Sequence, residues 1–331
     1  MLGGRADSDE LRSLQAHVPA LVRCAHGPLG HGSACFDSHA LSYPLNLQTA
    51  LFGLAFAAMT TNDAMQRYYQ RDRERARLEF GLGLLEFERT TEILLRTLPP
   101  APAVVADIGG GPGRYTDWLV DLGYTVIHRD VVPDHVAQVN DKYLDSGPTT
   151  TVNTAVGDAC ELDLADASVD ALFLLGPLYH LPDPDDRNRA VSEAARVTRS
   201  GGRVYAAAIG RWSARIQGLL VDRLYREVPA GLDTIDEIDK TGFIAPVVDG
   251  GFTGYAHTPD DFRNDMTADN LELETLVAVE GIASAFTNED VAARLADPTD
   301  RTVLLDSLRM LEAVPELLGA SSHLLAVARR R

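Results

Sequence analysis

The sequence is poor in positive charge, in cysteine and in long apolar runs. Its 331 residues include 30 basic and 48 acidic side chains, and only two of the basic ones are lysines. The resulting net charge of −18 repels phosphate backbones, which disfavours a nucleic-acid substrate. The three cysteines form no disulfide framework, so we expect a cytoplasmic protein. The apolar stretch at 47–59 is too short and too interrupted to span a bilayer, so no membrane association is expected.

Residues 1–64 differ in composition from the rest of the chain, and we expect an N-terminal extension that is partly disordered. This region gathers ligand types of a zinc site at Cys24, His26, His31, Cys35 and His39. No paired Cys-x-x-Cys anchors them, so a chance cluster in a glycine-rich loop explains them better. The sequence therefore predicts no metal site.

From residue 65 the chain becomes rich in charged residues at helical spacing. Glu and Arg pairs at i,i+4 predict amphipathic helices at 68–80 and 84–98, the second ended by two prolines. We expect residues 65–100 to form a helical cap, with Tyr68 as a candidate substrate contact. A solvated helical face explains the same charges equally well.

A short apolar run at 104–108 predicts a buried parallel strand, which ends in the glycines Gly109, Gly111 and Gly113. Residues 115–123 then have apolar positions at helical spacing and end in a glycine. Glycine permits a tight turn with positive φ and leaves no Cβ to obstruct a ligand that lies across the backbone. The unit therefore predicts a binding site for a nucleoside derivative.

The pattern Asp107-x-Gly109-x-Gly111-x-Gly113 differs from the dinucleotide fingerprint G-x-G-x-x-G, which makes a nicotinamide dehydrogenase improbable. It resembles motif I of the class I S-adenosylmethionine-dependent methyltransferases. An acid at the strand end suits a ligand with an amino group and repels a pyrophosphate.

Four further landmarks resemble the same family in the same order. Asp130 ends a second strand, where a carboxylate can bind a ribose diol. Gly157-Asp158-Ala159 resembles the adenine-binding position, although Asp158 is also a candidate helix N-cap. A strand that ends near Gly176 resembles motif IV, and the glycine pair at 201–202 precedes a fifth strand. The resemblance implies S-adenosylmethionine as cofactor, held by Asp107, Gly109, Gly111, Gly113, Asp130, Val131, Asp158, Ala159, Leu175 and Gly176.

The implied fold is α/β, with a doubly wound, mostly parallel seven-stranded sheet whose last strand, at 322–328, is antiparallel. We expect residues 101–331 to form the methyltransferase domain. Within it, 211–257 is an insertion rich in glycine and aromatic residues, which is typical of a substrate lid and begins with a helix at 212–227.

A sulfonium is already a good methyl donor, so the enzyme mainly aligns the acceptor and excludes water. His180 directly follows the fourth strand and is the candidate general base, although a histidine that only packs there is equally compatible. Tyr179, Arg211 and His257 are candidate substrate contacts, against the alternatives of a core aromatic, a surface arginine and a structural histidine.

The expected function is methyl transfer from S-adenosylmethionine to oxygen, or else nitrogen, of a small molecule, in the class of natural-product intermediates. A subunit that binds the cofactor without catalysis, or a methyltransferase of RNA or protein, are the alternatives. The oligomeric state, monomer or homodimer, stays open.

Overall fold

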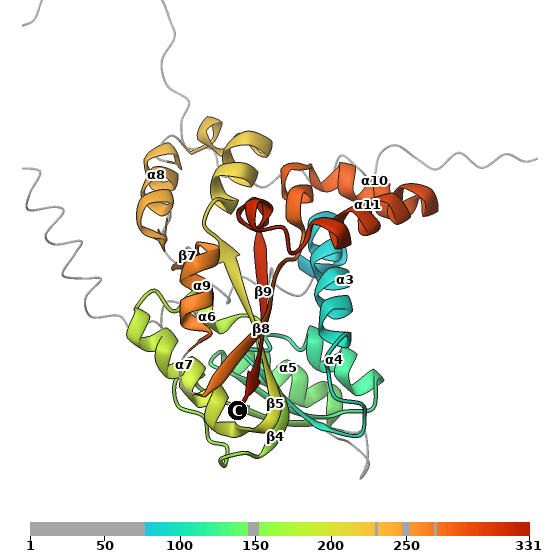
Figure 1. Cartoon of the computed structure of the whole chain (residues 1–331), viewed down its shortest axis with the longest axis vertical. Helices are drawn as coiled ribbons and strands as arrows, with labels where there is room; N and C mark the ends of the chain where they lie inside the picture. Colours follow the sequence, from blue (N-terminus) through green and yellow to red (C-terminus); the bar gives the residue numbers. More distant parts are fainter. Residues whose placement is uncertain (1–76, 145–151, 229–230, 247–251, 268–269) are drawn as a thin grey trace, which may run out of the picture. The chain divides into compact units, whose positions relative to one another are not determined.

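The computed structural model describes residues 77–144, 152–228, 231–246, 252–267 and 270–331 (Figure 1). Predictions for the N-terminal extension, including the histidine and cysteine cluster and Tyr68, lie outside these ranges. Within them, no helix is long and apolar enough to cross a membrane.

A single twisted sheet forms the centre of the described chain. Seven strands lie in the order β3-β2-β1-β4-β5-β9-β8, and only β9 runs antiparallel to its neighbours. This arrangement confirms the predicted doubly wound α/β class and the antiparallel last strand. The strands are β1 (Val104–Ile108), β2 (Thr125–Asp130), β3 (Val152–Val156), β4 (Val169–Leu174), β5 (Thr198–Gly210), β6 (Phe243–Ile244), β7 (Gly254–His257), β8 (Leu271–Ala278) and β9 (His323–Arg330).

Strands β6 and β7 extend the sheet beyond the seven that the sequence predicts. Ile209 near the end of β5 pairs with His323 of β9 on one edge and with Ala256 of β7 on the other. Because β4 occupies that other edge earlier along β5, β7 takes its place beyond the end of β4. The end of the 211–257 insertion is therefore hydrogen-bonded to the sheet at its carboxyl edge.

Helices cover both faces of the sheet because its strands are apolar on both sides. Alternate residues of β1, such as Val105 and Ala106, belong to separate buried clusters on the two faces. The helices are α3 (Gly81–Leu95), α4 (Arg114–Asp121), α5 (Pro133–Tyr143), α6 (Pro177–His180), α7 (Pro184–Val197), α8 (Gly231–Thr241), α9 (Pro259–Asp265), α10 (Asn288–Ala296) and α11 (Pro298–Leu311). Shorter 3₁₀ segments are η2 (Arg77–Glu79), η4 (Leu224–Arg226), η5 (Gly281–Ala285) and η6 (Pro315–Ala320), and η3 (Ala214–Val221) is π-helical.

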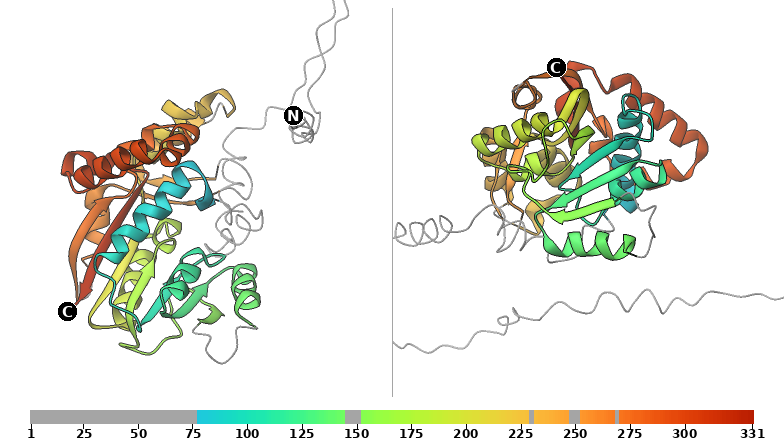
Figure 2. Two further views of the ribbon diagram at one scale, coloured as in Figure 1. Left: turned by 90° about the vertical axis from the view of Figure 1, so that its right-hand side faces the viewer. Right: turned by 90° about the horizontal axis from the view of Figure 1, so that it is seen from below.

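Helix α3, at the start of the described chain, packs beside α10 and α11 near its end (Figure 1, Figure 2). Leu85 of α3 joins a third apolar cluster with residues of both helices. Arg89 of α3 is fully buried and forms ion pairs with Glu92 and with Glu312, just after α11. The helix that was predicted as part of a cap is thus attached to the C-terminal helices.

The prediction of one helix at 212–227 is wrong, because the structure divides this region into two segments. A π-helical segment, η3, covers 214–221, and a separate 3₁₀ turn, η4, follows it. Arg223 between them adopts a left-handed backbone with φ +55°, which no regular α-helix accommodates. The apolar spacing predicted a helical region but not this break.

Candidate functional site

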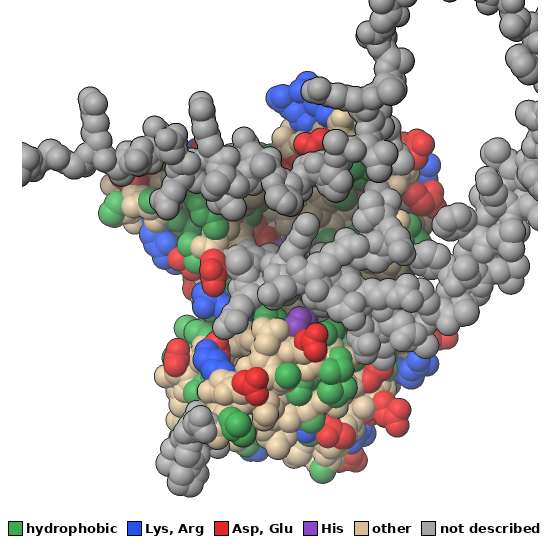
Figure 3. Space-filling model, turned by 180° about the vertical axis from the view of Figure 1, so that it is seen from behind, with side chains coloured by type: hydrophobic (Ala, Val, Ile, Leu, Met, Phe, Trp, Pro, Cys, Tyr) green, Lys and Arg blue, Asp and Glu red, His purple; other side chains and the backbone are tan. Residues whose placement is uncertain are grey.

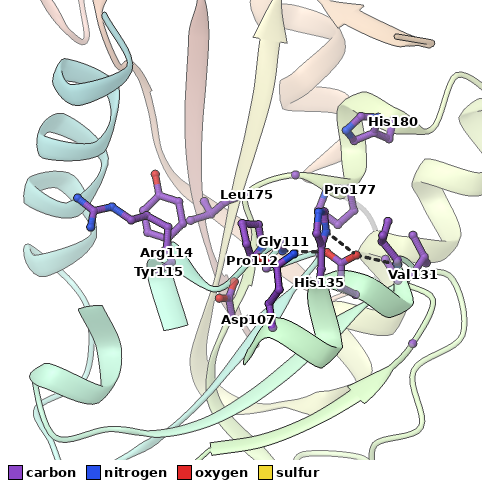
Figure 4. A pocket seen from close by; sticks show the side chains of 18 of the residues that line it. Asp107, Gly111, Pro112, Arg114, Tyr115, Val131, His135, Leu175, Pro177 and His180 are labelled. Carbon is purple, nitrogen blue, oxygen red and sulfur yellow. Dashed lines mark hydrogen bonds and ion pairs between the residues drawn. The ribbon is translucent and has the colours of Figure 1, made fainter. Parts of the chain in front are cut away.

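A cavity of about 660 Å³ lies at the carboxyl ends of β1, β2 and β4 (Figure 4). In this sheet the strand order reverses between β1 and β4, and ligands of open α/β sheets bind at such a switch point. The lining includes Leu78, Glu79, Asp107, Gly109, Gly111, Arg114, Tyr115, Asp130, Val131, His135, Asp158, Ala159, Leu175, Gly176, Tyr179 and His180. Nine of the ten residues predicted to hold the cofactor therefore line this cavity; the remaining one, Gly113, is the N-cap residue of α4.

The glycine turn has the backbone that its sequence predicts. Gly109, Gly111 and Gly113 have φ of +68°, +55° and +91°, a region that favours glycine. A Cβ on Gly109 would lie 2.6 Å from Cγ of Pro177, whereas a Cβ on Gly111 would meet no atom within 4 Å. Gly109 thus permits close packing against the β4 end, and Gly111 leaves open space on the cavity side.

Asp130 at the end of β2 is buried, and its carboxylate joins two backbone segments. Oδ2 accepts the N–H of Gly111 and Oδ1 accepts the N–H of Val132, each at 2.8 Å. Burial raises the pKa of this carboxyl, but the His135 ring and the two N–H groups outweigh it and hold the pKa below its ordinary value. Asp130 is therefore an ionised acceptor at the cavity wall.

Asp107 is also buried, with Oδ2 accepting the hydroxyl of Thr116 at 2.8 Å. Burial raises the pKa of Asp107 above its ordinary value, although nearby His128 and the Thr116 hydroxyl act in the opposite direction. A cationic group placed in the cavity would lower this pKa and bind the charged form. The residue thus matches the amino group that the sequence pattern predicted there.

Asp158 and Ala159 form a turn after β3 at the opposite wall from α4. Oδ1 of Asp158 accepts the N–H of Cys160 at 2.8 Å, so the carboxylate orders its own turn. No helix begins there, which removes the N-cap alternative in favour of this turn.

The wall beyond β4 is aromatic. Tyr179 and His180 lie in the short helix α6, with ring centroids 5.0 Å apart, and Phe252 lies 4.9 Å from the His180 ring. Phe252 belongs to the 211–257 insertion, which thus contacts the cavity residues directly. Figure 4 shows His180 above the glycine turn and Pro177.

Arg211 and His257 do not line this cavity. Arg211 is buried, where it pairs with Asp261 and donates to the carbonyl of Ala256. His257 is fully buried beside Asp265, with Nε2 3.1 Å from Oδ2, and burial lowers its pKa. Both side chains have partners inside the protein, and the cavity gives no support to their predicted substrate contacts.

Three features of the cavity were not predicted. His135 of α5 lies beside Asp130, five residues after it, and this spacing across the strand end was the available signal. Arg114 lies over the ring of Phe87, 4.1 Å from its centroid, so α3 contacts the start of α4. Leu78 and Glu79 of η2 line the same cavity.

One cluster of metal-ligand types occurs elsewhere among the described residues. Glu86, Glu280 and His323 bring single ligand atoms within 4.8 Å of one another. Glu280 is buried and accepts the His323 ring at 2.6 Å, the Ser321 hydroxyl at 3.1 Å and the backbone N–H of His323 at 2.9 Å. These bonds are those of a buried ion pair.

Comparison with known proteins places this site in a family. A family model described as a methyltransferase domain matches residues 106–206, which include the glycine turn and the ends of β2, β3 and β4. Residues 106–206 thus match a methyltransferase domain, which confirms the predicted methyltransferase family for this part of the chain.

Curated relatives match this chain over part of their length. An uncharacterized methyltransferase of Mycobacterium tuberculosis is 36% identical over 132 residues, which are 38% of this chain and 50% of the relative. A protein of Pyrenophora dematioidea named an O-methyltransferase is 31% identical over 125 residues, or 37% and 46% of the two chains. The chain thus spans about half the length of the curated relatives it matches.

A crystal structure of a protein from Pyrococcus horikoshii OT3 shares the fold. The TM-score is 0.52 at 15% sequence identity, and the similarity covers 80% of this chain and 98% of the other chain.

The cavity fits the cofactor of the family. Its lining holds six carboxylates against one arginine and one lysine, which suits a ligand whose sulfonium and amino groups are positive. The open space beside Gly111 admits a ligand against the backbone, and Asp130 is an ionised acceptor for hydroxyl groups.

Proposed function

We propose that this protein transfers a methyl group from S-adenosylmethionine to an oxygen atom of a small, aromatic or apolar acceptor, with nitrogen as the second choice of atom. The observation that carries the proposal is the position of His180. Its imidazole lines the cavity just beyond β4, in an aromatic wall with Tyr179 and Phe252.

In this proposal the cofactor-binding residues keep their predicted roles. Asp107 binds the amino group, and Asp130 accepts the ribose hydroxyls, with Val131 against the nucleoside. Asp158 and Ala159 hold the adenine, and the glycine turn supports the ligand along its backbone. Leu175 and Gly176 end the wall beside the reacting centre. Apart from Gly113 of the glycine turn, all of these residues line the cavity.

The protein's own chemical task is small. S-adenosylmethionine, when bound, supplies an electrophilic methyl group on a sulfonium. His180 takes the proton of the acceptor hydroxyl as its oxygen forms the new bond to carbon, so that no alkoxide is released into the site. Tyr179 and Phe252 exclude water and orient a flat acceptor against the ring of His180.

The charge of the cavity limits the acceptor. Six carboxylates in the lining disfavour an anionic acceptor and suit a neutral or cationic one. On the face seen in Figure 3, the described part of the chain carries acidic and basic side chains interspersed, without a continuous basic patch. Together with the net charge of −18, this supports a small molecule rather than RNA as substrate.

Two parts of the chain would cover the acceptor. Residues 65–100 form the predicted cap, and its described part, η2 and α3, reaches the cavity through Leu78 and Glu79. Residues 211–257 form the predicted lid, which reaches it through Phe252. The proposal includes a cytoplasmic location, which the scarcity of cysteine supports.

The choice of oxygen is supported by the name of the 31% identical relative from Pyrenophora dematioidea, an O-methyltransferase. It is also supported by the presence of a candidate base, because a hydroxyl must lose its proton during transfer whereas a carboxylate need not.

Calorimetric titration with S-adenosylmethionine and S-adenosylhomocysteine tests the binding half of the proposal. We expect micromolar affinity for the wild type. Asp130→Ala should weaken it by about 1–3 kcal/mol, the value of a hydrogen bond to a charged group. No binding by folded wild-type protein would remove the proposal.

Turnover separates an enzyme from a subunit that only binds the cofactor. Wild-type protein is incubated with S-adenosylmethionine and a panel of phenols, alcohols and amines, and S-adenosylhomocysteine is measured by mass spectrometry. Product that accumulates only with an acceptor supports catalysis, and hydroxyl acceptors should exceed amines. Tight binding without product from any acceptor would favour the non-catalytic alternative.

A further inference from the structure

His135 and Asp130 form a buried pair in the wall of the cavity. Nδ1 of His135 lies 3.3 Å from Oδ1 of Asp130, and each side chain is 7% exposed. His135 stands in the first turn of α5, where Pro133 occupies the start of the helix. The strand end and the helix start thus bring a histidine against the acid that the family pattern singles out.

The donors that the described residues supply to Asp130 are distributed unequally between its oxygens. Among these residues, Oδ1 accepts both the N–H of Val132 and the ring of His135, whereas Oδ2 accepts only the N–H of Gly111. Each carboxylate oxygen has about two acceptor positions. Oδ1 is therefore saturated, and Oδ2 retains one position for a further donor.

The His135 ring determines which oxygen of the Asp130 carboxylate keeps an open acceptor position. Because an ionised carboxylate only accepts hydrogen bonds, Nδ1 carries the hydrogen in this pair. The N–H groups of Gly111 and Val132 each hold one oxygen of the carboxylate, but without the ring Oδ1 would have an open acceptor position as well. With the ring in place, Oδ2 is the oxygen that keeps an open position before any ligand arrives.

We propose that His135 is a positioning residue that holds Asp130 with Oδ2 presented to a ribose hydroxyl, so that it sets the preference of the site for nucleosides with intact ribose hydroxyls. This inference rests on the proposed role of Asp130 in cofactor binding. His135 acts through Asp130 and takes no part in methyl transfer.

The test compares two nucleosides on the full-length chain by calorimetry. The probes are S-adenosylhomocysteine and its analogue without the 2′ and 3′ hydroxyls, and the variants are His135→Leu and His135→Asn. His135→Leu should weaken S-adenosylhomocysteine by about tenfold, as expected for the loss of a hydrogen bond to a charged group. It should leave the affinity for the deoxy analogue unchanged, which a general distortion of the cavity would not do.

His135→Asn is the matched control, because its amide N–H can take the place of Nδ1–H, and we expect it to recover most of the affinity. In an Asp130→Ala background, His135→Leu should have no further effect on S-adenosylhomocysteine binding. Circular dichroism checks that each variant is folded, and His135→Asn keeps the test open if the leucine variant does not fold.

Two results would overturn the inference alone, while the wild type still binds S-adenosylhomocysteine. One is an equal loss for both nucleosides in His135→Leu, which indicates a structural role. The other is unchanged affinity in a folded leucine variant. Failure of the wild type to bind S-adenosylhomocysteine overturns the proposed function itself, and this inference with it.

Discussion

The hydroxyl of Thr116 donates a hydrogen bond to the buried carboxylate of Asp107, which places the start of α4 against the end of β1. This carboxyl has a pKa above its ordinary value of 3.8, mainly because it is buried. The stability that its protonation contributes is present below pH 3.8 and is lost as the pH rises through the raised pKa. At neutral pH this buried carboxyl group therefore destabilises the folded protein.

Asp107→Asn should remove this unfavourably buried ionisable group and increase the free energy of unfolding at pH 7 by about 1 kcal/mol. The same change should weaken S-adenosylmethionine binding at least tenfold, by loss of the partner for a cationic group. Urea unfolding at pH 5 and pH 8 checks the first part, and the advantage of the variant should be larger at pH 8. A variant less stable than the wild type at both values would contradict the prediction.

Gly111→Ala and Gly109→Ala should change cofactor binding and the free energy of unfolding to different extents. Both positions have positive φ, which costs a residue with a Cβ about 1–2 kcal/mol. Only the Cβ at 109 also collides with Pro177, so Gly109→Ala should cost about 2–4 kcal/mol of unfolding free energy. Gly111→Ala should cost less stability but weaken cofactor binding more. Unfolding and calorimetric titration of the two variants give the comparison, and the reverse order of stability would be inconsistent with the structure.

His180→Gln should lower kcat with a hydroxyl acceptor by about 10²–10⁴-fold, the usual contribution of a general base. The affinity for S-adenosylhomocysteine should stay within about twofold, since the residue faces the acceptor. Tyr179→Phe is the control, because it keeps the aromatic wall and should retain most of kcat. Unchanged turnover in His180→Gln would remove the residue from the mechanism.

His323→Asn should destabilise the protein by about 3–5 kcal/mol at pH 7, because it leaves the Glu280 carboxylate buried without its charged partner. Burial raises the pKa of Glu280, but the charge and hydrogen bonds of His323 outweigh it, so that the folded-state pKa lies below 4.5. The contribution is thus present above pH 4.5 and is lost as the pH falls through the lowered pKa. Thermal unfolding from pH 3 to pH 8 should show wild type and variant converging in acid. Addition of EDTA should not change the wild-type Tm if the cluster is an ion pair, and a drop in Tm would indicate a bound metal.

The sequence predicted the central sheet well because its strands are buried on both faces. A continuous apolar run such as 104–108 is a strong strand signal, and the observed β1 has the same bounds. Helix capping likewise depends on local sequence, as at the start of α9, where Thr258 and Asp261 form reciprocal capping hydrogen bonds. The family motifs lie at strand ends, so a correct sheet brought them to one cavity.

What the sequence could not predict depends on contacts between distant segments. His257 and Arg211 were assigned to the acceptor because both border the insertion, but Asp265 and Asp261 of α9 engage them inside the protein. Such ion pairs arise from tertiary packing, which periodicity does not encode. His135 was missed because its spacing of five residues from Asp130 does not by itself give their distance, which also depends on the geometry of the turn between β2 and α5.

The two ends of the 211–257 insertion meet at one point, because the N–H of Arg211 donates to the carbonyl of His257 at 2.8 Å. When the two ends of a segment lie this close together, the segment can be lengthened, shortened or exchanged at little entropic cost to the rest of the chain. In the proposed function, the sheet that binds the cofactor and the wall that faces the acceptor can thus change independently, both in evolution and in engineering. Acceptor range can diverge by replacement of this one module, while the nucleoside half of the cavity stays as it is.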